Sequence, residues 1–210
     1  MWLRIATALV FIGLSSNTLA DKWIVLGDSI SAGYGMDVEE SWVTLFDQRL
    51  NEQLDGEHTV VNASISGETT GGGLARLPNL LDNHADADWI IVELGGNDGL
   101  RGYPIGTMRD NLRQIIEISQ DKGLKVILVG MQIPPNYGTR YTRQFRASYD
   151  EISAEYEVPL VEVFLENVAF EENLMQDDGI HPTAEAQPIL LDNVWSVVAT
   201  VMLTSANDDA

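Results

Sequence analysis

A serine that follows a short apolar run is a candidate to form a covalent intermediate. Ser29 lies in the segment 27–33, which reads GDSISAG, directly after the apolar run 22–27. A serine hydroxyl is a weak nucleophile until a positioned base takes its proton. At the end of a strand, the Ser29 Oγ would lie exposed over the sheet edge, and its N–H would be free to donate. The segment lacks the Gly-x-Ser-x-Gly turn of the common α/β-hydrolases. Asp-Ser after a strand is also found as an ordinary turn or helix cap.

Three histidines could act as the base, and one of them lies in a turn that leads into the last expected helix. His181 lies in the segment 177–182, which reads DDGIHP. Asp178, three residues earlier, can fold back within this turn and accept the Nδ1–H of His181. That bond would fix the tautomer and leave Nε2 to accept the serine proton. The alternative is an Asp-Gly turn beside a bystander histidine. His58 and His84 are expected to be exposed loop residues.

An acyl-transfer reaction also needs hydrogen-bond donors where the negatively charged oxygen develops. Two glycine-dense segments follow the second and third apolar runs of the sequence. Gly67 lies in the first segment, where a backbone N–H can approach a ligand closely because glycine has no side chain. Asn97 lies in the second and offers a neutral side-chain amide. The alternative for both segments is an ordinary turn, and neither carries a known phosphate-binding glycine pattern.

The composition excludes several other kinds of site. The chain has no cysteine, so disulfides, thiolate metal sites and cysteine nucleophiles are excluded. The three histidines show no metal-ligand spacing, and no cofactor is expected.

The 12 basic and 32 acidic residues give a net charge of −20. Such a surface repels nucleic acid and anionic membranes and favours solubility. A saline habitat would explain this charge, although acidic proteins also occur without one.

Strands that alternate with helices must position these residues. The expected strands are 22–27, 59–62, 89–94, 125–130 and 159–163. The expected helices contain the periodic apolar residues of 42–54, 74–81, 108–116, 141–156 and 189–201. This order predicts an α/β fold, a three-layer sandwich with a five-stranded parallel sheet between two layers of helices. In such sheets, ligands bind beyond the carboxyl ends of the strands, which is where the polar candidates cluster.

The two ends of the chain are expected to lie outside this single domain. Arg4, the apolar run 5–14 and the small residues that end at Ala20 are typical of a cleaved signal peptide. The apolar run is too short to span a bilayer, and no later segment is expected to do so. We therefore expect residues 1–20 to be a signal peptide, 21–204 the folded domain and 205–210 a disordered acidic tail. The expected location is the periplasm or the exterior after cleavage near Ala20.

Four short blocks occur in order along the chain and identify a family resemblance. They are GDS at 27–29, SGET at 66–69, GGND at 95–98 and DGIHP at 178–182. With these blocks the chain resembles the SGNH (GDSL-type) hydrolases. It is most similar to the bacterial periplasmic branch of thioesterase I, lysophospholipase and arylesterase. The resemblance covers essentially the whole chain after the leader. It includes LARLP at 74–78, PNYG at 135–138 and MQDD at 175–178.

The resemblance implies a role for each candidate residue. Ser29 would be the nucleophile, His181 the base and Asp178 the residue that orients it. The oxyanion hole would consist of the Ser29 N–H, the Gly67 N–H and the Asn97 amide. The implied activity is hydrolysis of acyl esters and thioesters, such as aryl esters, lysophospholipids and acyl-CoA-type thioesters. No cofactor is expected. The oligomeric state is open, although nothing in the sequence suggests more than a monomer or a stable insertion into a membrane.

Two other functions fit parts of the same pattern. Other branches of the fold remove acetyl groups from polysaccharides, so an exported glycan acetyl-esterase is the alternative enzyme. A binding protein with a retired site is the alternative from another class. The presence of all of Ser29, Asn97, Asp178 and His181 argues against it.

Overall fold

The computed structural model describes residues 20–54 and 56–208. The expected signal peptide therefore lies outside the described residues, apart from Ala20. Five strands form one parallel sheet in the order β2-β1-β3-β4-β5. Their bounds are β1 Lys22–Gly27, β2 Thr59–Asn62, β3 Trp89–Glu93, β4 Lys125–Val129 and β5 Leu160–Val161. The prediction of a five-stranded parallel sheet is confirmed.

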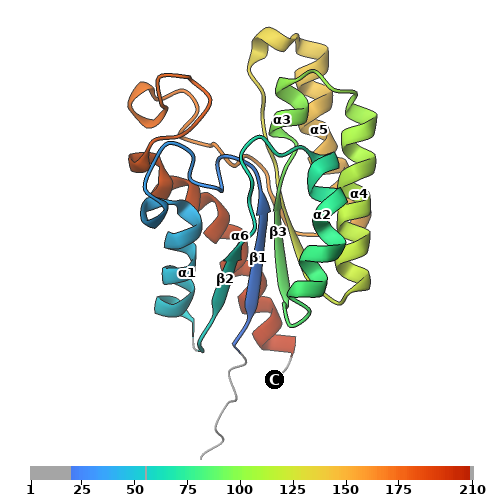
Figure 1. Ribbon diagram of the computed structural model, residues 1–210, viewed down its shortest axis with the longest axis vertical. Coiled ribbons are helices and arrows are strands. Elements are labelled where there is room, and N and C mark those ends of the chain that lie inside the picture. Colours follow the sequence, from blue (N-terminus) through green and yellow to red (C-terminus); the bar gives the residue numbers. More distant parts are fainter. Residues whose placement is uncertain (1–19, 55, 209–210) are drawn as a thin grey trace, which may run out of the picture.

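Helices cover both faces of the sheet and make it the middle of three layers (Figure 1). α1 and α6 pack against each other on one face, and α2, α4 and α5 pack side by side on the other. The longer helices are α1 Trp42–Gln53, α2 Thr70–Asn83, α4 Ile105–Asp121, α5 Thr139–Tyr156 and α6 Gln187–Asp208. The short helix α3 spans Gly96–Leu100, and single 3₁₀ turns span Val38–Glu40, Pro135–Tyr137, Glu172–Leu174 and Ala184–Ala186.

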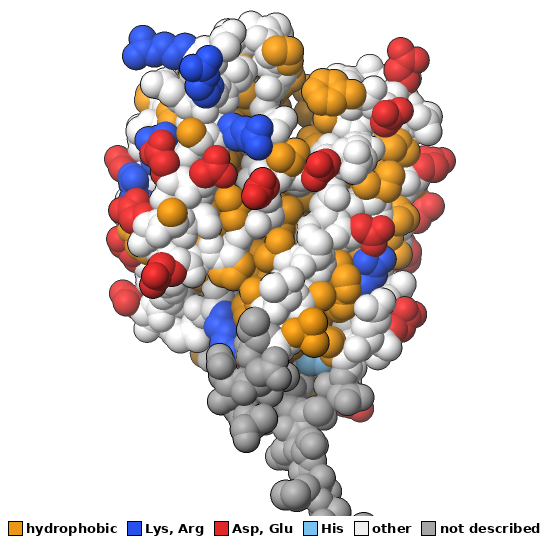
Figure 2. All heavy atoms as spheres, turned by 180° about the vertical axis from the view of Figure 1, so that it is seen from behind, with side chains coloured by type: hydrophobic (Ala, Val, Ile, Leu, Met, Phe, Trp, Pro, Cys, Tyr) orange, Lys and Arg blue, Asp and Glu red, His pale blue; other side chains and the backbone are white. Residues whose placement is uncertain are grey.

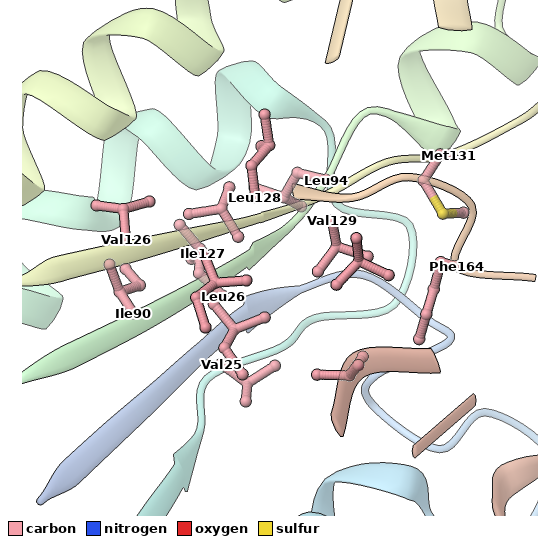
Figure 3. Close-up of a cluster of buried hydrophobic side chains, with 14 of the residues drawn as sticks. Val25, Leu26, Ile90, Leu94, Val126, Ile127, Leu128, Val129, Met131 and Phe164 are labelled. Atoms are coloured by element: carbon pink, nitrogen blue, oxygen red, sulfur yellow. The ribbon is translucent and has the colours of Figure 1, made fainter. Parts of the chain in front are cut away.

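The central strands are apolar on both faces because helices cover both faces. Figure 3 shows side chains of β1, β3 and β4 packed together, including Leu26, Ile90 and Leu128, which are fully buried. The edge strand β5 is shorter than the expected 159–163. Only Leu160 and Val161 pair with β4, and Pro159 has no N–H to donate to a ladder.

The last helix corrects one expectation and bears on a second. α6 continues to Asp208, so residues 205–208 are helical where we expected a disordered tail, and 209–210 lie outside the described residues. The part of the chain that the structure describes also holds one helix, 184–203, long and apolar enough to cross a membrane by length and composition. The sequence analysis anticipated none. Leu190, Val194 and Val198 of this helix are buried, so one of its faces packs against the core.

The acidic excess lies on the surface. Figure 2 shows Asp and Glu side chains spread over one face of the molecule, with fewer Lys and Arg side chains between them. In the described part of the chain, six Lys or Arg side chains lie within 4.0 Å of a carboxylate. Such exposed pairs contribute little stability. These ion pairs therefore explain little of the stability of the fold.

Candidate active site

The candidate nucleophile and base meet although 152 positions separate them in the chain. The Ser29 Oγ lies 2.9 Å from the His181 Nε2, and the His181 Nδ1 lies 2.6 Å from the Asp178 Oδ2. Ser29 is only 8% exposed, so its hydroxyl is accessible from one side. The three side chains thus form a continuous relay at the carboxyl end of β1, the edge where a parallel sheet binds ligands.

A tight turn after β1 presents Ser29. The Ala32 N–H donates to the Asp28 carbonyl at 3.0 Å, and the Tyr34 N–H donates to the Ser29 carbonyl at 3.1 Å. The Asp28 Oδ1 accepts the Ile30 N–H at 3.0 Å, the pattern of an Asx turn. These bonds reverse the chain at once, so Ser29 lies at the point of a bend.

A second turn presents His181, and the Asp178 carboxylate organises it. The Asp178 Oδ1 accepts the backbone N–H groups of Ile180 and His181, at 2.9 and 3.0 Å. This leaves Oδ2 to accept the His181 Nδ1–H. Gly179 has φ +64°, a conformation that favours glycine. Burial alone would raise the pKa of Asp178, but the hydrogen bonds from His181 and Ile180 outweigh it and lower the pKa to about 2. Asp178 is therefore an anion at neutral pH.

Contacts with the first turn hold the second turn in place. The Gln176 Nε2 donates to the Tyr34 carbonyl at 2.8 Å and to the Pro182 carbonyl at 2.9 Å. The Tyr34 ring lies against the His181 ring, with centroids 4.3 Å apart. The sequence analysis assigned no role to Tyr34 or Gln176, because nothing in their spacing indicates that the two turns meet.

The expected oxyanion donors are available. Among the described residues, neither the Ser29 N–H nor the Gly67 N–H has a hydrogen-bond acceptor. The Arg101 guanidinium donates to the Gly67 carbonyl at 2.9 Å, and the Arg101 N–H donates to the Asn97 carbonyl at 3.1 Å. Arg101 thereby joins the loop that carries Gly67 to the helix that carries Asn97. Ser29 and Gly67 therefore each offer a free N–H, the kind of donor that a developing oxyanion requires.

A buried carboxylate orients Asn97. The Asn97 Nδ2 donates to the Asp28 Oδ2 at 3.0 Å, which leaves the second amide hydrogen free. Asp28 is only 2% exposed, and burial raises its pKa to about 6, against the opposing effects of the Ile30 N–H, the His181 charge and the Asn97 amide. A Cβ on Gly96 would lie 3.3 Å from the Asp28 Oδ2. A side chain at position 96 would therefore crowd this contact.

A second carboxylate ties the Asn97 helix to its neighbour. The Asp98 Oδ2 accepts the Thr70 N–H at 2.8 Å, and its Oδ1 accepts the Thr70 hydroxyl at 2.7 Å. Thr70 is the first residue of α2, where backbone N–H groups lack helical partners. Asp98 thus fixes α3, and with it Asn97, against a long and rigid helix. The sequence analysis treated Asp98 only as part of a block.

The remaining histidines lie apart from this site. His58 precedes β2, at the opposite end of the sheet from Ser29. Only 5% of His58 is exposed, and its Nδ1 accepts the Asp21 N–H at 3.1 Å, so the expectation of an exposed loop residue is wrong. Asn51 also hydrogen-bonds both backbone groups of His58, which draws it into the fold. His84 is half-buried at the end of α2.

Nothing in the described residues forms a metal centre by its donor groups. No group of three or more His, Cys, Asp or Glu side chains in 20–54 and 56–208 is arranged to hold a metal ion. A shallow depression of about 650 Å³ adjoins the second turn and is lined by Gly35, Met36, Asp37, Glu40, Gln176, Thr183 and Ala184.

The chain is similar to known enzymes along nearly its whole length. It is 43% identical over 200 residues to "Esterase TesA" of Pseudomonas aeruginosa, which covers 95% of this chain and 98% of that protein. It is 45% identical over 173 residues to "Thioesterase 1/protease 1/lysophospholipase L1" of Escherichia coli K12, which covers 82% and 81%. The crystal structure of TesA superposes with a TM-score of 0.82 at 46% identity and covers 85% of this chain and 98% of that one.

A family model matches the part of the chain that contains the site. The sequence model of the GDSL-like Lipase/Acylhydrolase family matches residues 25–188, which run from β1 to the start of α6. This range contains Ser29, Gly67, Asn97, Asp178 and His181. The chain therefore belongs to the GDSL-like lipase/acylhydrolase family and is a hydrolase of esters and thioesters.

Proposed function

We propose that the protein hydrolyses medium- to long-chain acyl esters and thioesters through an acyl-enzyme on Ser29. The observation that carries the proposal is the relay of 2.9 Å from the Ser29 Oγ to the His181 Nε2 and 2.6 Å from the His181 Nδ1 to the Asp178 Oδ2. Relatives at 43% and 45% identity are named esterase and thioesterase, which supports this substrate class.

The first half of the reaction forms the acyl-enzyme. The Ser29 Oγ attacks the carbonyl carbon as its proton passes to the His181 Nε2. The Asp178 anion stabilises the imidazolium through Nδ1–H. The carbonyl oxygen becomes an oxyanion, which accepts hydrogen bonds from the Ser29 and Gly67 N–H groups and from Asn97. The carbon–oxygen or carbon–sulfur bond to the leaving group then breaks, and His181 returns the proton to that group.

The second half repeats the chemistry with water. His181, again neutral, takes a proton from a water molecule, which attacks the acyl carbonyl. The same donors stabilise the second oxyanion. When it collapses, the bond to the Ser29 Oγ breaks, His181 returns the proton to the serine, and the free acid leaves.

Apolar side chains near the nucleophile fit an acyl chain. Tyr34 and Ile65 are each 50% exposed and Tyr103 is 46% exposed, all on loops at the carboxyl edge of the sheet. The Tyr141 hydroxyl donates to the Tyr103 carbonyl at 2.8 Å and anchors the loop that follows α3. We infer that the segment 100–105 borders the acyl groove, since it continues directly from the helix that carries Asn97.

A series of substrates tests the proposal. p-Nitrophenyl esters and matched thioesters from C2 to C16 should give the highest kcat/KM at medium or long chain length. EDTA should have no effect, and a fluorophosphonate probe should label the protein. The alternative of a glycan acetyl-esterase predicts a strict preference for acetyl esters and activity on acetylated xylan. That result would overturn the proposed substrate class.

We also propose that the enzyme acts outside the cytoplasm as a monomer. The support for export is the arrangement of Arg4, the apolar run 5–14 and Ala20 in the sequence. N-terminal mass analysis of protein from the periplasm or medium should find a start at or near Asp21. An intact Met1 on membrane-bound protein would contradict export, and light scattering that gives twice the mass would contradict the monomer.

A further inference from the structure

The last residue of β3 places a carboxyl group in the interior, next to the loop that carries the nucleophile. Glu93 pairs in register with Gly27, two residues before Ser29. The Glu93 side chain is 0% exposed, and the other four residues of β3 are apolar. No Lys, Arg or His side chain in the described part of the chain lies within 4.0 Å of the Glu93 carboxyl. A buried charge without such a partner is costly.

The Glu93 carboxyl holds the nucleophile loop on both sides of Ser29. Its Oε2 accepts the Asp28 N–H at 3.2 Å and the Ser31 hydroxyl at 2.7 Å. The Ser31 Oγ also accepts the Trp42 Nε1–H at 3.2 Å, so the one hydroxyl hydrogen of Ser31 is directed to Glu93. Asp28 and Ser31 are both buried. The loop therefore depends on this carboxyl for two hydrogen bonds that water cannot replace.

Gly27 leaves the space that this arrangement occupies. A Cβ on Gly27 would lie 2.7 Å from the Glu93 Oε2 and 2.7 Å from the Ser31 Cβ. Both distances are shorter than real Cβ contacts, so a larger residue would displace Glu93 or Ser31. The glycine before Asp28 is thus explained by what lies against it.

The surroundings of Glu93 favour its neutral form. The Glu93 Oε1 has no hydrogen-bond partner among the described residues, and an unpaired buried oxygen costs more on a charged carboxylate than on a neutral carboxyl. Burial raises the pKa of Glu93 well above its ordinary range, and the charge of Asp28 raises it further. Burial raises the pKa of Tyr149 in α5, and the neighbouring Glu93 raises it further. The charge of Asp98 raises the pKa of Asp28, and the charge of His181 lowers it.

We propose that Glu93 is a positioning residue of this hydrolase. Its neutral carboxyl fixes the loop that carries Ser29, and it leaves Asp28 as the buried anion that orients the Asn97 amide. The inference rests on the proposed role of Ser29 and goes beyond the relay of Ser29, His181 and Asp178. Glu93 touches neither the substrate nor Ser29, so it acts only through the Asp28 N–H and the Ser31 hydroxyl.

Two substitutions at position 93 separate positioning from bulk packing. Glu93→Gln keeps an uncharged acceptor oxygen for both donors, so kcat should stay within about threefold of wild type and the pH profile should coincide with it. Glu93→Leu keeps a similar volume but no acceptor. Its kcat should fall roughly 10- to 100-fold with KM nearly unchanged, because a displaced Ser29 Oγ attacks the bound substrate more slowly. Leu112→Ala, in the buried face of α4, is the control for lost stability alone.

The outcomes decide the proposal in either direction. A Glu93→Leu protein that melts like Leu112→Ala but keeps the wild-type kcat would show that Glu93 is only structural. If kcat falls as far in Glu93→Gln as in Glu93→Leu, the proposal that Glu93 acts as a neutral carboxyl is wrong. If Glu93→Leu does not fold, Ser31→Ala removes one donor from the same contact. It should lower kcat at least threefold, and an unchanged kcat would overturn the proposal. A wild-type protein that hydrolyses no acyl ester would instead contradict the proposed function.

Discussion

Two carboxyl systems support Ser29, and their environments are opposite. Asp178 belongs to a surface turn, and its side chain is 39% exposed. Asp28 and Glu93 lie at the ends of β1 and β3, and they are 2% and 0% exposed. Hydrogen bonds lower the pKa of Asp178 to about 2 despite the effect of burial, whereas burial raises the pKa of Asp28 to about 6.

The difference shows how one side-chain type supplies two functions. The Asp178 anion is stable on the surface and acts by its charge, because it must stabilise an imidazolium that forms during the reaction. The buried pair acts by its geometry. Its oxygens accept the hydrogen bonds that set the backbone before Ser29 and the direction of the Asn97 amide. We therefore expect changes at the surface turn to alter proton transfer, and changes in the buried pair to alter alignment and stability.

The two systems converge on Ser29, so its removal should have the largest effect. Ser29→Ala should lower kcat roughly 10⁴-fold or more and abolish labelling by a fluorophosphonate. The melting temperature should change little because the hydroxyl contributes little packing. Loss of activity in Ser31→Ala or Ser66→Ala, with Ser29→Ala active, would identify a different nucleophile.

Asp178→Asn should have the next largest effect, and the structure predicts why. The Asp178 Oδ1 accepts two backbone N–H groups, so the amide oxygen would take that place and its NH₂ would face the His181 Nδ1. The histidine would then carry its proton on Nε2 and could not accept one from Ser29. We expect kcat to fall roughly 10²- to 10⁴-fold, the usual contribution of a positioned base.

A double mutant checks this reading of the surface turn. Because Asp178 and His181 act as one unit, Asp178→Asn in a His181→Ala background should add little. Steady-state measurements of kcat for both single mutants and the double mutant give the coupling between Asp178 and His181. Losses that multiply would argue against the pairing.

Asn97 tests the buried side at the oxyanion. Its amide should act mainly in the transition state, so Asn97→Ala should lower kcat by roughly 10²- to 10³-fold with little change in KM. Asn97→Asp should be at least as damaging, because its carboxylate would lie against the Asp28 Oδ2 and where the negative charge develops. A milder Asn97→Asp, with kcat near wild type, would remove Asn97 from the site. Thermal melts confirm that both variants fold.

The two aspartates should contribute opposite dependences of stability on pH. The folded-state pKa of Asp28 is raised, so the native protein binds more protons than the unfolded chain between about pH 4 and 6. Its contribution to stability falls as pH rises through this window. The pKa of Asp178 is lowered, so its contribution is present above about pH 4 and is lost as pH falls toward 2.

Melting curves of Asp28→Asn and Asp178→Asn resolve these contributions. The melting temperature of wild type relative to Asp28→Asn should decrease by a few degrees from pH 4 to 7. Relative to Asp178→Asn it should decrease as pH falls from 4 to 2. Parallel curves for wild type and Asp28→Asn would show that Asp28 does not titrate in this window.

The smallest effects on activity should come from the histidines outside the site. His58→Ala and His84→Ala should leave kcat/KM within about twofold of wild type, as neither lies near Ser29. His58→Ala should nevertheless lower the free energy of unfolding by about 1 kcal/mol or more, because a buried side chain is removed and the part-buried Asp21 N–H loses its acceptor. His84→Ala should lower the free energy of unfolding by less, because His84 is only half-buried. Equal melting temperatures for the two variants would contradict the buried role of His58.

Local patterns in the sequence predicted much of this protein. Continuous apolar runs predicted the parallel strands, since strands covered on both faces need apolar side chains on both. The hydrogen bond between His181 and Asp178 was also predictable, because three residues of one turn separate them and few backbone angles decide whether they meet. The family blocks singled out Ser29, Gly67 and Asn97 in the same way, although their roles stay predictions until they are tested.

Only the tertiary structure decided which distant residues meet. The strand order β2-β1-β3-β4-β5 places Glu93 beside Gly27, and with it the Asp28 N–H and the Ser31 hydroxyl. A glutamate in an apolar run was visible in the sequence, but its two acceptor bonds depend on residues more than 60 positions away. The burial of His58 and the packing of Tyr34 on His181 are of the same kind. Such contacts follow from how helices and strands pack around a common core, and no local spacing encodes that packing.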